Sequence, residues 1–105
     1  MAQFDVHENA NAATRKHTPY LLNVQADVLS ELATRVVVPL RGKAGREGTV
    51  ISRLHPVISV AGEDHIAVVT EMAAVQTSVL GPRVDAAQAQ RTEITAALDL
   101  LLTGF

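Results

Sequence analysis

The hydrophobic residues of this sequence change their spacing once, and that change limits the folds open to the chain. Valine and isoleucine are concentrated between positions 24 and 84, in short apolar runs separated by turn residues. From about Asp85 to Leu102, apolar residues recur instead at steps of three and four. The first pattern is typical of short strands and the second of one face of a helix. The sequence therefore predicts a mainly β (α+β) domain with an amphipathic C-terminal α-helix.

The strand pattern is strongest in the first half of the chain. Residues 3–7 place Phe4 and Val6 on one face, and Tyr20–Val24 resumes the pattern after a polar loop at 8–18. Arg35–Leu40 is apolar enough to predict a central strand, which we expect to end near Pro39 because proline lacks an N–H. The other predicted features are a loop or short helical turn at 27–34, strands near 56–60, 65–70 and 75–80, a turn at 62–64, and an end to the β region at Gly81-Pro82.

The helix is predicted to begin at Asp85 and to end before Gly104. Aspartate favours the first turn of a helix, and glycine is common just past the end. The predicted buried face consists of Ala87, Arg91, Ile94, Leu98 and Leu101. With several short strands before it, this helix would pack on a small barrel or sheet, and residues 1–105 would form one domain.

Composition excludes several classes of protein. Hydrophobic residues make up 48% of the 105 and charged residues 19%, which is enough apolar material for a core. Cysteine is absent, so disulfides and thiolate chemistry are excluded. A net charge of −2 with 3% aromatic residues gives little basis for direct nucleic-acid binding. No apolar run approaches the 20 or so residues of a membrane span, and no targeting segment is recognisable, so we expect a cytoplasmic protein.

Residues that carry catalysis or bind metals do not form a familiar constellation. The four histidines lack ligand spacing, and no serine has the flanking glycines of a nucleophile elbow. The Gly42–Gly48 segment lacks the spacer and hydroxyl residue of a phosphate loop. Arg41, Lys43 and Arg46 form a basic cluster, which we interpret as a solvated loop. No catalytic residue, metal site or cofactor is predicted.

The C-terminal residues are unusually apolar. Leu100–Leu102 leads directly to Gly104 and Phe105, whereas chain ends in water usually tolerate polar residues. Such an end favours docking, either in the protein's own core or at an interface with a partner, and both alternatives stay open.

Seven short segments carry a family resemblance through their order and spacing. They are Gln3-Phe4 with Val6, Val24–Asp27, Arg35–Leu40, Leu54–Val57, Glu71–Val75, Ser78–Gly81 and the near-terminal Gly104. They match an opening strand, a Val-Gln-Ser-Asp run, a central strand of Arg, three apolar residues and Pro-Leu, and the later steps of one family. In this respect the chain resembles the CcdB-type toxins of bacterial toxin–antitoxin modules over nearly its whole length.

The resemblance implies a small SH3-like antiparallel β-barrel with a C-terminal helix, working as a homodimer. It implies a toxin that binds the A subunit of DNA gyrase and traps the cleaved-DNA complex. Such a toxin is not an enzyme, because it acts by binding one state of its target. The other implied partner is a cognate CcdA-like antitoxin, whose disordered part folds onto the toxin. The two together would repress their own operon, with the antitoxin contacting the DNA.

The family's gyrase-contact positions carry over to two segments of this chain, a pair after the Val-Gln-x-Asp run and the exposed face and end of the helix. The positions are Val28, Leu29, Arg91, Asp99, Leu102, Thr103, Gly104 and Phe105. The best-known member of the family ends in Trp-Gly-Ile, whereas this chain ends in Thr103-Gly104-Phe105, and Arg91 replaces an acidic residue. The loss of tryptophan removes a flat surface for a target arginine.

Two other functions are compatible with the same fold. A relic of the family could bind the antitoxin without poisoning gyrase, and the altered C-terminal triplet favours this alternative. An endoribonuclease of the MazF kind shares the barrel, since fold does not determine function. RNA cleavage would need a basic cleft with a general acid and a general base.

Overall fold

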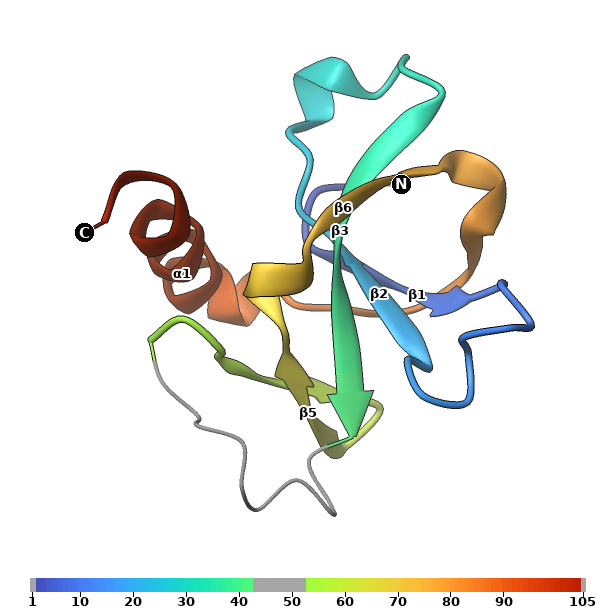
Figure 1. Ribbon diagram of the computed structural model, residues 1–105, viewed down its shortest axis with the longest axis horizontal. Coiled ribbons are helices and arrows are strands. Elements are labelled where there is room, and N and C mark those ends of the chain that lie inside the picture. Colours follow the sequence, from blue (N-terminus) through green and yellow to red (C-terminus); the bar gives the residue numbers. More distant parts are fainter. Residues whose placement is uncertain (1, 43–52, 105) are drawn as a thin grey trace.

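The computed structural model describes residues 2–42 and 53–104, which form an antiparallel sheet and a C-terminal helix (Figure 1). The strands are β1 (Asp5–Asn9), β2 (Tyr20–Asn23), β3 (Thr34–Gly42), β4 (Val57–Val60), β5 (Glu63–Ala67), β6 (Ala73–Gln76) and β7 (Leu80–Ala86). The helical elements are the short 3₁₀ turns η1 (Asp27–Leu29), η2 (Val69–Glu71), η3 (Thr77–Val79) and η4 (Gln88–Gln90), followed by α1 (Arg91–Thr103).

The sheet curls into a half-barrel with α1 beside it, which confirms the predicted mainly β architecture (Figure 1). The strands follow the order β4-β5-β3-β2-β1-β7, and β6 pairs with β3 as well. One edge of β3 is therefore shared, because residues 34–37 pair with β6 and residues 40–42 pair with β5. All of these pairings are antiparallel.

Pro39 lies inside β3 and not at its end, so the predicted strand end is wrong. The Pro39 carbonyl accepts a hydrogen bond from Val68 N–H at 3.0 Å, on the edge that β5 and β6 share. The proline nitrogen faces that same edge, between the segments of β3 that the two strands cover. A missing N–H is tolerated there, since neither β5 nor β6 pairs with Pro39.

The first and last strands differ from their predicted bounds. β1 begins at Asp5, because Phe4 has a φ of 70° and leaves the extended conformation. Gly81-Pro82 does not end the β region, since β7 continues through it to Ala86 and pairs with β1. Gly81 is needed there, because a Cβ at this position would lie 3.0 Å from the carbonyl oxygen of Glu8. The turn between β4 and β5 is formed by Ala61 and Gly62, one residue earlier than predicted.

The helix begins at Arg91, six residues later than predicted. Asp85 is not its N-cap, because its carboxylate accepts hydrogen bonds from the N–H groups of Ala61 and Ala86. Gln90 precedes the helix and ties it to β4, donating from Nε2 to the Val57 carbonyl at 2.5 Å. The C-terminal prediction is confirmed: Gly104 is left-handed, with a φ of 85°.

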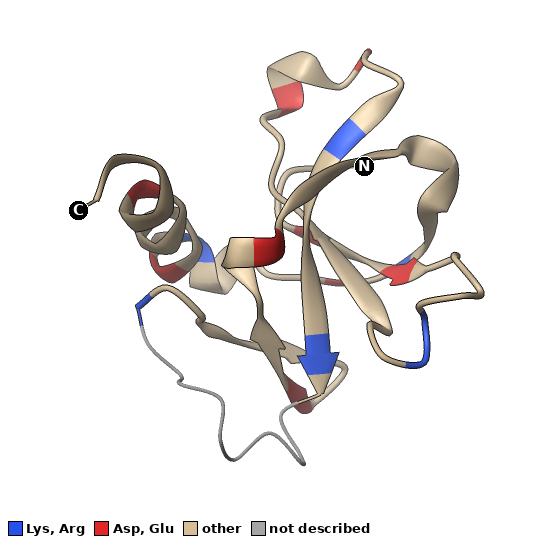
Figure 2. Ribbon diagram, in the orientation of Figure 1, with Lys and Arg blue, Asp and Glu red and all other residues tan. Residues whose placement is uncertain are grey.

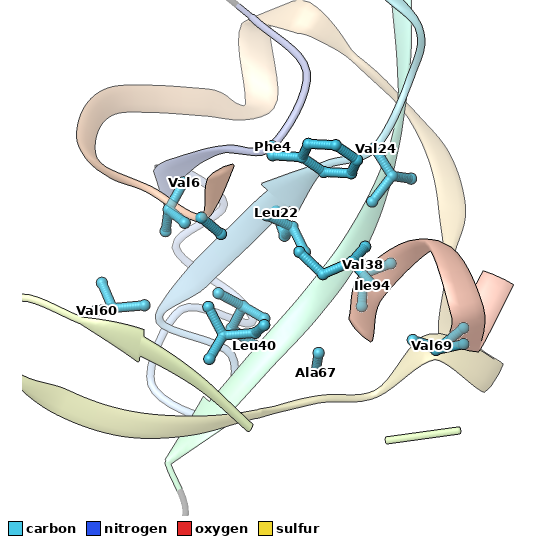
Figure 3. Close-up of a cluster of buried hydrophobic side chains, with 13 residues drawn as sticks. Phe4, Val6, Leu22, Val24, Val38, Leu40, Val60, Ala67, Val69 and Ile94 are labelled. Carbon is cyan, nitrogen blue, oxygen red and sulfur yellow. The ribbon is translucent and has the colours of Figure 1, made fainter. Parts of the chain in front are cut away.

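The main core lies between the sheet and α1 (Figure 3). Its buried residues include Phe4, Val6, Leu22, Val24, Val38, Leu40, Ile58, Val60, Ala67, Val69, Ala87, Ile94 and Ala97. Ile94 and Ala97 are the buried residues of α1, and Leu98 packs partly against them. The predicted helix face is thus partly wrong, because Arg91 and Leu101 are exposed. Burial of the Ile94 side chain contributes roughly 1.5–3 kcal/mol to the attachment of the helix.

A second, smaller cluster lies on the opposite face of the sheet. Leu21 and Val37 alternate with Leu22 and Val38 of the main core, so they point the other way. Leu80 of β7 joins this cluster. Both faces of β2 and β3 are therefore apolar, as a central strand requires. Within residues 2–42 and 53–104, no helix is long and apolar enough to cross a membrane.

Candidate functional site

The loop between β2 and β3 exposes large apolar side chains over a few residues. Val28 is 87% exposed, Leu29 is 47% exposed and Leu32 is 51% exposed. Val28 and Leu29 lie in η1, the short helical turn that the sequence allowed at 27–34. Leu32 was not predicted as a contact, although an isolated leucine in the polar stretch after Ser30 was the available signal. Exposed apolar residues gathered in this way mark an interaction surface.

Two buried polar side chains hold the backbone of this loop. Arg35 donates through its guanidinium to the carbonyl oxygens of Ser30, Leu32 and Thr34. Gln25 donates from Nε2 to the carbonyls of Leu29 at 3.0 Å and Thr34 at 3.3 Å. The loop is therefore fastened from the inside, while its leucines and Val28 face outward.

The loop is also tied to the N-terminal segment. Gln3 N–H donates to the Asp27 carboxylate at 2.7 Å, and Gln3 Nε2 donates to the Val24 carbonyl at 3.2 Å. Gln3 lies in the turn closed by Asp5, whose carboxylate accepts a hydrogen bond from Ala2 N–H at 2.9 Å. The position of η1 thus depends on contacts from the start of the chain as well as from β2 and β3.

The end of α1 exposes the second group of apolar side chains. Leu102 is 67% exposed and Leu101 is 36% exposed. Local hydrogen bonds shape this end: Thr103 Oγ1 donates to the Asp99 carbonyl at 2.7 Å, and Gly104 N–H donates to Leu100 O at 3.0 Å. Phe105, the last predicted contact residue, lies outside the described residues. The apolar end is therefore not buried in the protein's own core, at least as far as Gly104.

The remaining predicted contacts share one stripe of α1. Arg91, Asp99 and Leu102 are spaced by eight and three residues, which places them along one side of the helix over about three turns. Arg91 and Asp99 also line one shallow depression of about 350 Å³, together with Thr92, Thr95 and Ala96. The structure thus brings the helix residues together, on a face next to the one that packs on the sheet.

The two predicted segments lie at different corners of the chain. Figure 1 shows η1 and its loop at the top of the view and the end of α1 at the left. A single chain therefore offers two apolar surfaces rather than one continuous patch.

A polar group near the other end of β3 is relevant to the endoribonuclease alternative. Arg41 donates two hydrogen bonds to the Glu71 carboxylate, at 2.7 and 2.8 Å, and one to Thr18 Oγ1. The bond to Glu71 raises the pKa of Arg41, against an opposing effect of burial. His55 and Thr70 lie 3.2 Å apart, between Nε2 and Oγ1. The guanidinium is therefore engaged with a carboxylate, so the prediction of a solvated Arg41 is wrong.

The charges of the described residues are interspersed. Figure 2 shows the Lys and Arg positions and the Asp and Glu positions distributed over different elements of the ribbon. Lys43 and Arg46, the other members of the predicted basic cluster, lie outside the described residues. Among residues 2–42 and 53–104, no group of three or more His, Asp or Glu side chains could hold a metal ion.

Comparison with known proteins identifies the family of this chain. Residues 3–104 match the protein family described as "CcdB protein". The chain belongs to the CcdB family. Membership covers both apolar surfaces and every strand of the sheet, and it supports a toxin of a toxin–antitoxin module.

Solved structures share the fold at low sequence identity. An endoribonuclease in complex with its cognate antitoxin from a mycobacterial species is 13% identical, with a TM-score of 0.75 over 97% of this chain and 94% of that one. A second mycobacterial endoribonuclease is 13% identical, with a TM-score of 0.73 over 97% of this chain and 90% of that one. At this level of identity, the similarity extends to the fold alone.

Proposed function

We propose that this CcdB-family protein binds the A subunit of DNA gyrase and traps the complex in which the DNA is cleaved. The observation that carries the proposal is the exposure of large apolar side chains at both segments where the family resemblance predicts gyrase contacts. Val28 of η1 is 87% exposed and Leu102 of α1 is 67% exposed. Exposed apolar side chains that are grouped together are typical of a surface that binds another protein.

The proposed mechanism is differential binding rather than catalysis. A ligand that contacts the cleaved-DNA state of gyrase more strongly than the resealed state raises the population of the cleaved state. No bond in the toxin is made or broken in this scheme, so the protein acts as an inhibitor and not as an enzyme. Broken DNA would persist for as long as the toxin stays bound.

A homodimer fits this mechanism. In a two-fold dimer the same surfaces are presented twice, which suits a target that is itself symmetric. The exposed end of α1, with Leu101 and Leu102, offers apolar surface for such an interface or for the target. We propose that the dimer works in the cytoplasm, where gyrase acts on the chromosome.

The proposed neutralising partner is a cognate CcdA-like antitoxin. A disordered antitoxin segment that folds on the toxin can cover a large surface, at the cost of its own ordering. The pair would repress their operon, with the antitoxin contacting the DNA. The net charge of −2 on the toxin is compatible with that division.

RNA cleavage is the second candidate, because two solved structures with the same fold are endoribonucleases. A ribonuclease needs a general acid and a general base beside a cationic group that can bind phosphate. In this chain Arg41 is engaged by the carboxylate of Glu71 in a bidentate ion pair. This arrangement favours a structural role for Arg41, so we place RNA cleavage second to gyrase poisoning.

The deciding experiment is DNA cleavage by purified gyrase with ATP and supercoiled plasmid, in the presence and absence of the protein. Linear DNA that accumulates after detergent and protease treatment would support gyrase poisoning. Val28→Ser should reduce the linear product, whereas the matched control Val84→Ser, on β7 at 37% exposure, should not. A folded dimer that yields no linear DNA would contradict the proposal in favour of the antitoxin-binding relic. Cleavage of single-stranded RNA by the same preparation would favour the nuclease.

A further inference from the structure

Arg35 is a buried cation that hydrogen-bonds to the backbone of the loop beside it. Its side chain belongs to a residue that is only 6% exposed, and among the described residues no carboxylate forms an ion pair with it. A buried charge is costly unless it is well hydrogen-bonded. Here the guanidinium donates to three carbonyl oxygens, those of Ser30, Leu32 and Thr34. Ser30 and Leu32 lie between η1 and β3, and Thr34 is the first residue of β3.

Gln25 holds the same segment from the β2 side. It is 9% exposed, and its Nε2 donates to the carbonyls of Leu29 and Thr34. Its Oε1 accepts a hydrogen bond from Val36 N–H at 3.0 Å, so every polar atom of the side chain has a partner. Together the two side chains satisfy the carbonyls of residues 29, 30, 32 and 34.

The β2–β3 pair also has backbone hydrogen bonds of its own. β2 and β3 are paired by their own ladder, with Leu22 opposite Val38 and Asn23 opposite Val37. The buried side chains of that pair form the core clusters without help from the loop. The effect of the inward bonds is to fix the loop backbone while Leu29 and Leu32 point outward. A loop ordered in advance loses less entropy when it binds.

We propose that Arg35 and Gln25 are positioning residues for gyrase binding, and that Leu32 is a third contact beside Val28 and Leu29. Arg35 and Gln25 hold the loop in its binding shape before the target arrives, and neither touches the target. This inference rests on the proposed function, because it takes gyrase A as the partner of the loop.

The test measures binding of the full-length protein to purified gyrase A. Arg35→Lys keeps the charge but replaces a planar fork by a single ammonium group, which cannot span three carbonyls in the same way. If the variant loop holds its binding shape for about one tenth of the time, affinity falls about tenfold. Amide hydrogen exchange should rise in residues 29–33 and stay unchanged in the β2–β3 ladder.

A double-mutant cycle separates positioning from general stability. In a Val28→Ala/Leu29→Ala/Leu32→Ala background, Arg35→Lys should weaken binding less than about twofold, because the three contacts it positions are already removed. An equal tenfold loss in both backgrounds would overturn the inference, as would unchanged affinity in the single variant.

Leu32→Ala provides a second variant that keeps the loop anchors intact. Because Leu32 is 51% exposed, its truncation should leave folding and amide exchange unchanged while weakening gyrase A binding about tenfold. Unchanged binding would remove Leu32 from the contact surface. If the unaltered protein does not bind gyrase A, the proposed function fails first and the positioning inference fails with it. If the unaltered protein binds and every variant binds equally well, only the inference fails.

Discussion

The loop around η1 and the end of α1 both expose apolar side chains, but their backbones are held in different ways. The loop is held by the side chains of Gln25 and Arg35, both nine-tenths or more buried, and by Gln3 N–H, which donates to Asp27 from the start of the chain. At the helix end, Thr103 Oγ1 and Gly104 N–H donate to carbonyls four residues earlier in the same helix. We infer that, of the two proposed contact surfaces, the loop is preformed by buried side chains, whereas the end of α1 can adjust when a partner binds.

Deletion of residues 103–105 is expected to have the largest effect on gyrase poisoning. The truncation removes the last three residues of the helix-end surface, next to Leu102, while leaving the buried contacts of Ile94 and Ala97 intact. We expect linear DNA in the gyrase assay to disappear, with the melting temperature and antitoxin binding nearly unchanged. If gyrase still accumulates as much linear DNA with the truncated protein, the loop alone is sufficient for poisoning, and the helix end has no separate role.

A charge introduced on the η1 loop should have the next largest effect on gyrase A binding. Val28→Asp places a carboxylate where the target would bury it, and an unpaired buried charge is strongly unfavourable. We expect gyrase A binding to weaken by at least about 30-fold, on the order of 2 kcal/mol. The matched control is Val84→Asp on β7, which should bind normally. Equal losses from both variants would point to charge in general and not to the loop.

The attachment of the helix can be tested without touching either surface. Ile94→Ala removes a buried side chain, and such truncations destabilise by about 2–5 kcal/mol. We expect the loss in chemical denaturation, with faster amide exchange in α1 and little change in the η1 loop. Leu101→Ala, at 36% exposure, is the matched control and should cost less than about 0.5 kcal/mol. If the loop loosens as much as the helix, the two regions are not independent.

Acid should loosen the loop before the helix. Burial raises the pKa of Asp5, but hydrogen bonds from Ala2 N–H and Arg83, together with the charge of Arg83, bring it below its ordinary value of 3.8. A depressed pKa in the folded state contributes stability that is complete above the ordinary value and is lost as the pH falls through the folded pKa. Because Asp5 closes the turn that brings Gln3 to Asp27, amide exchange in η1 should rise below pH 3.8.

Two variants distinguish this effect from acid denaturation in general. Asp5→Asn should loosen η1 already at neutral pH. Asp85→Asn should instead affect the β4–β5 turn, because the N–H groups of Ala61 and Ala86 lower the pKa of that carboxyl. An acid response of η1 that is unchanged by Asp5→Asn would disconnect the N-terminal turn from the loop.

The parts of the fold that depend on local spacing could be predicted from the sequence. The apolar periodicity gave the sheet and the helix, and Gly104 gave the end of α1. The start of the helix could not be predicted, because Asp85 is engaged by Ala61, which lies 24 residues away in the chain. Pro39 was misplaced for a similar reason, since its position depends on how β5 and β6 divide one edge of β3.

The candidate site shows the same division. Val28, Leu29 and Leu102 were predicted through the family resemblance, and their exposure agrees with a role in contacts. The roles of Gln25 and Arg35 had no signal in the sequence. A glutamine just after a strand and an arginine on a strand are ordinary residues, and only the folded loop brings carbonyls of residues 29–34 within their reach.

The inward anchoring of the η1 loop also affects how such a toxin can evolve. The residues that hold the loop are buried, whereas those proposed to contact a partner contribute little to the core, as the 87% exposure of Val28 indicates. Substitutions at 28, 29 and 32 can therefore accumulate with little loss of stability. A toxin of this kind could therefore change its target or its antitoxin by substitution of exposed side chains, while the buried residues that hold the loop stay the same.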